Sequence, residues 1–153
     1  MARQALGAAA GPFAVMNLIK PRVNLHAIRN LAPLGPFYAP ARAMVQTGEA
    51  NGPFAIEPSV EPAPARARLI ADRLLAGCFL PVLQALDEEV AVPADFDRGA
   101  REALKFGRGP CALMDELGHA EVARIVAPAL EAYSLTPPRS LGRVGQLAST
   151  CRD

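Results

Sequence analysis

Apolar residues recur along most of the chain at the three-and-four spacing of an α-helix, and little of the sequence alternates as a half-buried strand does. The strongest pattern runs from Ala65 to Val90, where a wide apolar stripe is flanked by charged positions. It predicts one long core helix with a kink at Pro81, because proline removes a backbone donor inside a helix. The pattern therefore favours an all-α fold.

Shorter helices are predicted on both sides of this long one. A helix begins at Pro93 and runs to Gly107, where a glycine-rich turn stops it, and the chain restarts near Pro110. Later helical segments are expected over residues 111–117, 120–133 and 141–148. Those before the long helix are expected over residues 11–20, 21–32 and 41–48, after a helix end at residues 3–6.

A proline-rich segment, residues 51–64, separates the two groups of helices. Its composition is typical of an extended linker, too rich in proline for a helix and too short for a domain. We therefore expect a partial first helical unit over residues 1–50 and a complete second unit over residues 65–150.

The two groups share an internal repeat. When residues 3–16 are placed on residues 101–114 without gaps, seven of the fourteen positions are identical, including Gly11-Pro12 on Gly109-Pro110. This pattern favours a duplicated unit. One such unit cannot close its own core, whereas two units packed together can. The first copy lacks a counterpart of the long helix, so its apolar face needs a cover from the second copy, a partner chain or further residues.

The composition of the chain excludes several classes of function. Apolar residues make up 51% of the chain and can supply a core, while a net charge of +1 excludes binding to nucleic acid or to an anionic membrane by charge alone. Cys78, Cys111 and Cys151 are odd in number and widely spaced, which predicts neither a disulfide framework nor a zinc site and indicates a reducing, cytoplasmic location. The first residues predict no signal peptide and no membrane span.

The stretch from Asp72 to Gly118 resembles the C-terminal domain of the L-3-hydroxyacyl-CoA dehydrogenases. The similarity lies in the segments "DRLLAGCFLP", "VPADFDRG" and "KFGRGPCALMDELG". The first half, with "LAPLGPFYAPARAMVQTGE", is similar to the end of the same domain in multifunctional fatty-acid oxidation subunits, which carry two such units in tandem. The resemblance implies two related helical units packed together, each of the 6-phosphogluconate dehydrogenase C-terminal type.

The same resemblance implies a function. It makes the chain the C-terminal substrate-side and dimerisation part of an NAD-dependent 3-hydroxyacyl-CoA dehydrogenase of fatty-acid β-oxidation or acyl-CoA oxidation. The family's catalytic His and Glu belong to a nucleotide-binding half, and no G-x-G-x-x-G between a strand and a helix stands here. We therefore expect no catalytic residue, bound cofactor or metal in this chain, and no activity without the NAD-binding half. The expected partners are acyl-CoA and either a second copy in a homodimer or a nucleotide-binding dehydrogenase domain.

Two positions are candidates for the substrate side. Asp72 replaces the family's Asn near the substrate, and Arg73 matches the Arg that follows it. His26 and His119 match no catalytic position and are expected to be surface or partly buried structural residues, while Asp97 and Asp115 are placed to cap or brace neighbouring turns. The positions expected to shape the turns are Gly11, Pro12, Phe13, Asp97, Gly107, Gly109, Pro110, Asp115 and Gly118.

Two other interpretations stay open. The chain could be an accessory subunit that docks onto a nucleotide-binding chain, which predicts an exposed hydrophobic face. It could instead be a diverged helical module that binds a partner chain or an acyl ligand without chemistry, an interpretation favoured by Asp72 in place of Asn.

Overall fold

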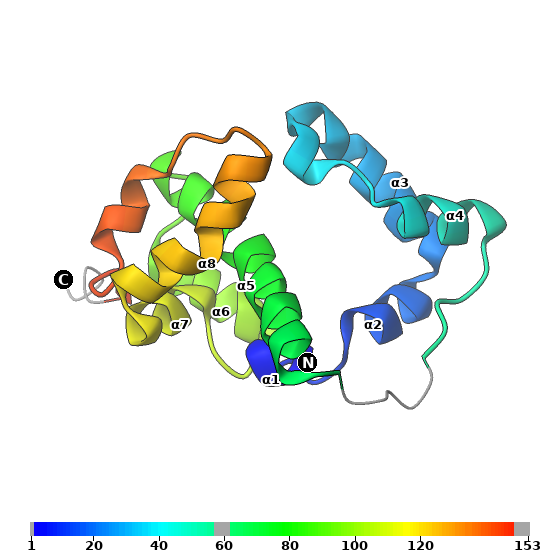
Figure 1. Ribbon diagram of the computed structural model, residues 1–153, viewed down its shortest axis with the longest axis horizontal. Helices are drawn as coiled ribbons and strands as arrows, with labels where there is room; N and C mark the ends of the chain where they lie inside the picture. The colour runs from blue at the N-terminus through cyan, green and yellow to red at the C-terminus, as the bar shows by residue number, and fades with distance from the viewer. Residues whose placement is uncertain (1, 57–61, 149–153) are drawn as a thin grey trace. The chain divides into compact units, whose positions relative to one another are not determined.

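The computed structural model describes residues 2–56 and 62–148, and every regular element in these ranges is helical (Figure 1). The prediction of an all-α fold is therefore confirmed. The α-helices are α1 Ala2–Ala5, α2 Pro12–Ile19, α3 Pro21–Leu31, α4 Arg42–Ala50, α5 Pro64–Asp87, α6 Pro93–Glu102, α7 Pro110–Leu117 and α8 His119–Ala132, and the 3-10 turns are η1 Ala32–Leu34, η2 Pro36–Tyr38 and η3 Arg139–Arg143. Helices α2, α3, α5, α6 and α7 begin with proline, whose fixed φ suits a first helical position.

The chain forms two compact units. The smaller comprises Ala10–Glu61, and the larger comprises Met1–Ala9 with Pro62–Asp153. Residues 1–50, expected as one partial repeat, are thus divided. The segment up to residue 9 joins the larger unit because α1 packs against α5 and the following turn bonds to residues 105–107.

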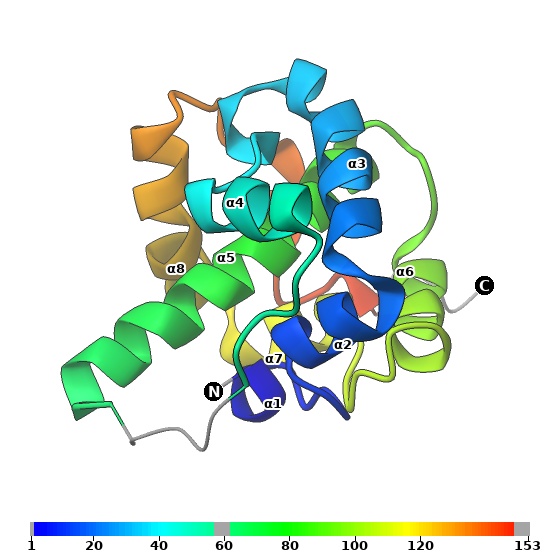
Figure 2. The ribbon, with the colours of Figure 1, turned by 90° about the vertical axis from the view of Figure 1, so that its right-hand side faces the viewer.

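Helix α5 forms the centre of the larger unit, with α7, α8 and η3 packed against it (Figures 1 and 2). Phe79, Leu80 and Leu83 have no exposed surface, and burying a side chain of this size contributes about 1.5–3 kcal/mol. By length and composition alone, α5 could also cross a membrane. Its buried residues are Ala76, Phe79, Leu80 and Leu83.

Two predicted elements differ from the structure. Helix α6 ends at Glu102 rather than at Gly107, because the chain leaves the helix through Lys105 with φ +55°. The helix expected over residues 141–148 is instead the 3-10 turn η3, which begins at Arg139. The Asp87 carboxylate at the end of α5 accepts hydrogen bonds from the Arg139 and Ser140 amides and so fixes where this turn starts.

In the smaller unit, α3 packs against α4. Hydrogen bonds between the Asn17 side chain and the Phe54 backbone hold the chain that follows α4. Gly48 allows the close approach of α4, since a Cβ there would lie 2.6 Å from the Leu25 side chain. The Asn17 side-chain amide donates to the Phe54 carbonyl (2.9 Å) and accepts from the Phe54 amide (2.7 Å). Phe54 also stacks on Phe13, so the start of the expected linker belongs to this unit, while residues 57–61 lie outside the described ranges.

The two copies of the repeat share their local geometry. Helices α2 and α7 correspond position by position over eight residues, and Gly11 and Gly109, which precede them, both have φ −70°. The residues that end the two helices, Lys20 and Gly118, correspond as well and have φ 80° and 78°. Only glycine adopts such an angle without cost, so Lys20 holds this turn at some strain.

The corresponding turns of the two copies also bond to each other within the larger unit. The Ala9 amide donates to the Lys105 carbonyl at 3.2 Å, and the Gly107 amide donates to the Gly7 carbonyl at 3.0 Å. Since residue 7 corresponds to 105 and residue 9 to 107, exchanging the copies turns one bond into the other. Gly7 and Lys105 share a positive φ, +60° and +55°. The two turns therefore pair through reciprocal backbone hydrogen bonds.

Candidate functional site on helix α5

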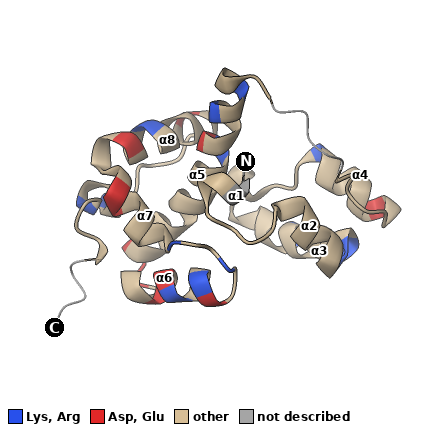
Figure 3. Ribbon diagram, turned by 90° about the horizontal axis from the view of Figure 1, so that it is seen from below, with Lys and Arg blue, Asp and Glu red and all other residues tan. Residues whose placement is uncertain are grey.

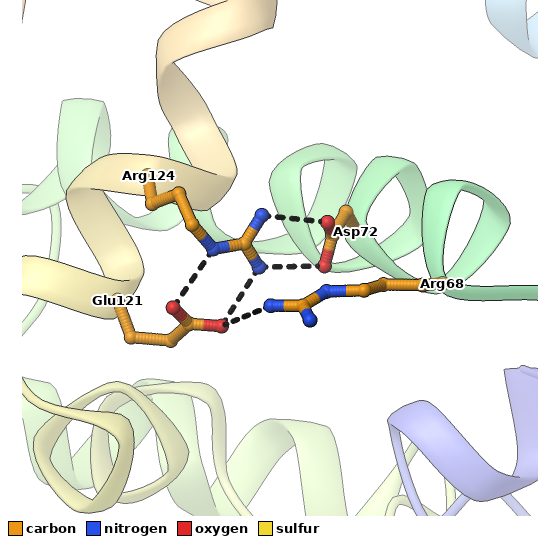
Figure 4. Close-up of polar contacts among 4 residues, drawn as sticks. All are labelled: Arg68, Asp72, Glu121 and Arg124. Atoms are coloured by element: carbon orange, nitrogen blue, oxygen red, sulfur yellow. Dashed lines mark hydrogen bonds and ion pairs between the residues drawn. The ribbon is translucent and has the colours of Figure 1, made fainter. Parts of the chain in front are cut away.

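The substrate-side candidate Asp72 belongs to an ion-pair network between α5 and α8 (Figure 4). The Arg124 guanidinium donates to both carboxylate oxygens of Asp72 at 2.8 and 2.9 Å. It also donates to both oxygens of Glu121 at 2.7 and 2.8 Å, and Arg68 lies 4.0 Å from Glu121. Forked contacts of this kind suit arginine, and they use both oxygens of Asp72 to join two helices.

The network holds its groups in their charged forms. Hydrogen bonds from Arg124 hold the pKa of the Asp72 carboxyl below its ordinary value, against the opposing effect of burial. The same guanidinium lowers the pKa of Glu121, and its bonds to Glu121 and Asp72 raise the pKa of Arg124. Asp72 is therefore a fixed anion at neutral pH and is not poised to exchange a proton.

Acidification is expected to weaken this network. Because the pKa of Asp72 is lower in the folded chain than the ordinary 3.8, its contribution to stability is complete above that value and is lost as the pH falls through the folded pKa. The melting temperature of the wild-type chain should therefore fall more steeply below pH 4 than that of an Asp72→Asn variant. At pH 7 the variant should lose no more than about 1 kcal/mol, since the pair is open to solvent.

Thermal melts followed by circular dichroism between pH 7 and about pH 3 would test this expectation. A Glu131→Gln variant serves as the control, because that exposed carboxylate makes no ion pair with the described residues. Equal slopes for the wild-type and Asp72→Asn proteins below pH 4 would show that Asp72 does not contribute in this way.

The other substrate-side candidate, Arg73, lies at a groove of about 640 Å³ between α5 and α6. The groove walls are apolar, with Leu74, Cys78 and Pro81 on one side and Phe96 on the other. Arg73 is exposed and makes no hydrogen bond or ion pair with the part of the chain that the structure describes. Asp72 and Arg73 thus lie on different sides of α5, and the structure does not bring them together in one polar site.

The cysteines of the larger unit do not form a nucleophilic site. Burial raises the pKa of the Cys78 thiol to about 11, and burial together with Asp97 and Asp115 raises that of Cys111 to about 12. Both thiols stay protonated at neutral pH and are therefore weak nucleophiles. Cys151 lies outside the described residues. Within the described ranges, no group of three His, Cys, Asp or Glu side chains is placed to hold a metal ion.

The turn residues of the second copy fit together around Asp97. Its carboxylate accepts hydrogen bonds from the amides of Cys111 (2.7 Å) and Ala112 (3.0 Å) in the first turn of α7. Gly109 makes room for this carboxylate, because a Cβ at that position would overlap the Asp97 side chain. Gly107 lies against Gly7 in the paired turns. These positions shape the backbone at the start of α7.

Asp115 holds the last described segment of the chain. One of its oxygens accepts from the Gly145 and Leu147 amides at 2.7 and 3.1 Å, and the other accepts from Ala148 at 2.8 Å. The corresponding residue of the first copy, Asn17, holds Phe54 by its side-chain amide. Both copies therefore use this position of the short helix to fasten the segment that follows the repeat.

Among the described residues, no side chain caps the start of α2 as Asp97 caps the start of α7. Gly11 and Pro12 correspond to Gly109 and Pro110, yet a Cβ at Gly11 would meet nothing within 4 Å. Phe13 is half exposed, whereas its counterpart Cys111 is fully buried. Figure 3 shows that α2 carries no charged residue, so its exposed surface is largely apolar.

Sequence reasoning missed Arg124, Glu121 and Asp87. The first two are separated from Asp72 by 52 and 49 positions, and only the spacing of Glu121 and Arg124 on one helix gave a local signal. His26 and His119, expected to be surface or partly buried structural residues, are both exposed on their helices and make no hydrogen bond or ion pair with the described residues.

Comparisons with models of protein families, with curated proteins and with solved structures find no match to this chain. A functional interpretation therefore depends on the motifs of the chain itself and on the places that they occupy in the two units.

Proposed function

We propose that the chain is the C-terminal substrate-side and dimerisation part of an NAD-dependent 3-hydroxyacyl-CoA dehydrogenase of cytoplasmic acyl-CoA oxidation. In this role it holds the acyl-CoA and a partner subunit, while a separate nucleotide-binding half binds NAD and carries the catalytic residues. The chain alone has no dehydrogenase activity.

One observation carries the proposal. The motifs from Asp72 to Gly118 that resemble the family lie on three successive helices of one unit, α5, α6 and α7. The position of Arg73 adds support, because a free guanidinium at the edge of an apolar groove suits a ligand with an anionic part and an aliphatic part. Asp72, held by Arg124, braces the helix that presents Arg73.

Calorimetric titration with acetoacetyl-CoA is the test. We expect the wild-type chain to bind this ester and to bind no NADH. An Arg73→Gln variant should bind the ester about tenfold more weakly, since losing one charge-assisted hydrogen bond costs roughly 1.5 kcal/mol. Arg66→Gln is the matched control, because Arg66 is also an exposed arginine of α5 but does not line the groove.

Light scattering during size-exclusion chromatography completes the test, since the proposal expects a dimer. A folded monomer that binds neither acetoacetyl-CoA nor NADH would contradict it, and so would equal loss of binding in the Arg66→Gln and Arg73→Gln variants.

A helical module that binds a partner or an acyl ligand without chemistry is the second candidate. It is favoured by one observation, the use of both Asp72 oxygens by Arg124, which leaves the position of the family's polar Asn without a group free to contact a substrate. Under this interpretation the Asp72→Asn variant gains no affinity for acetoacetyl-CoA. Under the first, restoring the Asn increases it.

A further inference from the structure

The smaller unit contains a pocket of about 320 Å³ between α3 and α4, two helices that pack side by side (Figure 2). Two of the residues that line it are buried, and the others are exposed and carry charged or titratable side chains. The buried ones are Leu25 and Gly48, and the exposed ones are Arg22, His26, Arg29 and Glu49. Small-molecule sites have volumes of about 300–1,000 Å³, so this pocket suits a small ligand.

Positive charge gathers on the α3 side of the pocket. Arg22, His26 and Arg29 are spaced four and three residues apart, which places them on one face of the helix. Positive side chains at this spacing repel one another. Arg22 also lies in the first turn of α3, near the positive end of the helix dipole, and this turn contains no acidic residue. The arrangement is therefore unfavourable unless an anion lies beside it.

The described part of the smaller unit supplies little negative charge to this face. Residues 10–56 contain four Lys or Arg residues and a single acidic residue, Glu49. The Arg29 guanidinium donates to the Glu49 carboxylate at 2.6 Å. The side chains of Arg22 and His26 make no hydrogen bond or ion pair with the described residues. Both side chains can therefore donate to an anion that enters from solution.

The ion pair of Arg29 with Glu49 shows that an oxyanion fits this pocket. The two side chains keep 51% and 58% of their surface exposed, and an ion pair so open to solvent adds little stability. An anion with more acceptor oxygens can therefore displace the Glu49 carboxylate from Arg29. A phosphate group has oxygens in several directions, and two of them match the fork of a guanidinium.

We propose that the pocket between α3 and α4 binds a phosphate group, either free or carried by a small molecule. Arg22, His26 and Arg29 donate to the phosphate oxygens, while Glu49 competes with the phosphate for Arg29 and lowers its affinity. The inference goes beyond the proposed function, because it concerns the smaller unit and holds whether or not Arg73 contacts acyl-CoA.

Titration of the isotope-labelled full chain with inorganic phosphate, followed by NMR at an ionic strength held constant with sodium chloride, tests this proposal. We expect saturable shifts of the amide signals of α3 and α4. Arg22→Gln should weaken phosphate binding about tenfold, the usual effect of losing one charge-assisted hydrogen bond. Arg42→Gln is the matched control, because Arg42 is an exposed arginine of the same unit that does not line the pocket.

A variant that gains affinity separates the proposal from effects of unfolding. Glu49→Gln removes the competing carboxylate and releases Arg29, so it should strengthen phosphate binding about fivefold. Glu131→Gln removes the same charge from an exposed position of the larger unit and should leave the affinity unchanged.

Glycerol phosphate distinguishes the two sources of the phosphate group. Binding of this ester at least as tight as that of inorganic phosphate, with the same loss in Arg22→Gln, would identify a small phosphate ester as the ligand. Binding of inorganic phosphate alone would identify free phosphate. Arg73→Gln keeps this proposal apart from the proposed function, since it should leave the affinity for inorganic phosphate unchanged.

Three outcomes would overturn the proposal. The first is the absence of saturable amide shifts in α3 and α4, or the same shifts with sodium chloride alone, which would reflect screening of charge. The second is an equal loss of affinity in Arg22→Gln and Arg42→Gln, which would indicate a general attraction to the basic unit. The third is an affinity of Glu49→Gln no higher than that of Glu131→Gln.

Discussion

Replacing Gly109 with alanine is expected to lower the unfolding free energy of the larger unit by about 2–4 kcal/mol. The new Cβ would overlap the Asp97 side chain, which has no room to stay in place. Once displaced, Asp97 can no longer accept the amides of Cys111 and Ala112, and the first turn of α7 loses its cap. The loss is large because Cys111 is fully buried and water cannot replace the carboxylate at its amide without opening the core.

Gly11→Ala is the matched control in the other copy of the repeat. Gly11 has the same φ of −70° before a helix of the same length, but nothing lies within 4 Å of its Cβ position. The expected change is within about 0.5 kcal/mol. Urea unfolding followed by circular dichroism measures both variants. Similar losses for the two would show that the backbone conformation, rather than the space occupied by Asp97, requires glycine at these positions.

The helices were predictable because their signals are local. The apolar stripe of α5 follows the helical period, and the prolines at residues 12, 93 and 110 mark helix starts through their fixed φ. The turn geometry of the repeat was also visible, since Gly-Pro restricts the backbone in the same way in both copies. In each case the physical cause lies within a few residues of the signal.

The features that depend on distant residues could not be predicted in this way. The turn after α6 is closed by local bonds to the Ala100 carbonyl and also by bonds to residues 7 and 9, which lie far away in the sequence. The ion pair of Asp72 with Arg124 spans 52 positions. The same holds for η3, whose start is set by Asp87 in another helix. Sequence periodicity carries no information about such pairings.

The candidate site residues show the same difference between features with local causes and features that depend on distant residues. Asp97 and Asp115 could be placed at turns because their side chains act on nearby helices and on the segment that follows. Asp72 and Arg73 were grouped because they are neighbours in sequence, yet a helix turns about 100° per residue and directs them to α8 and to the α6 groove. Adjacent residues on a helix rarely share a site.

Replacing Asp115 with alanine is expected to lower the unfolding free energy by about 2–4 kcal/mol. Three backbone amides, those of Gly145, Leu147 and Ala148, lose a charged acceptor at once. Leu147 is fully buried, so the segment that carries it has to remain in place for the core around α5 to stay closed. The substitution should therefore speed hydrogen exchange of these three amides far more than that of the α5 amides.

The Asp115→Asn variant separates the effect of the side-chain charge from that of the acceptor position. Its amide keeps one oxygen that can accept the Gly145 and Leu147 amides, but its nitrogen cannot accept the Ala148 amide. About half of the loss should return, and Ala148 should remain the fastest of the three to exchange. The first copy supplies the comparison, because Asn17 already serves this role with one donor and one acceptor at Phe54. Unchanged hydrogen exchange at residues 145–148 in Asp115→Ala would show that the carboxylate does not hold this segment. The hydrogen bonds of Asp115 would then add nothing to the stability of the segment.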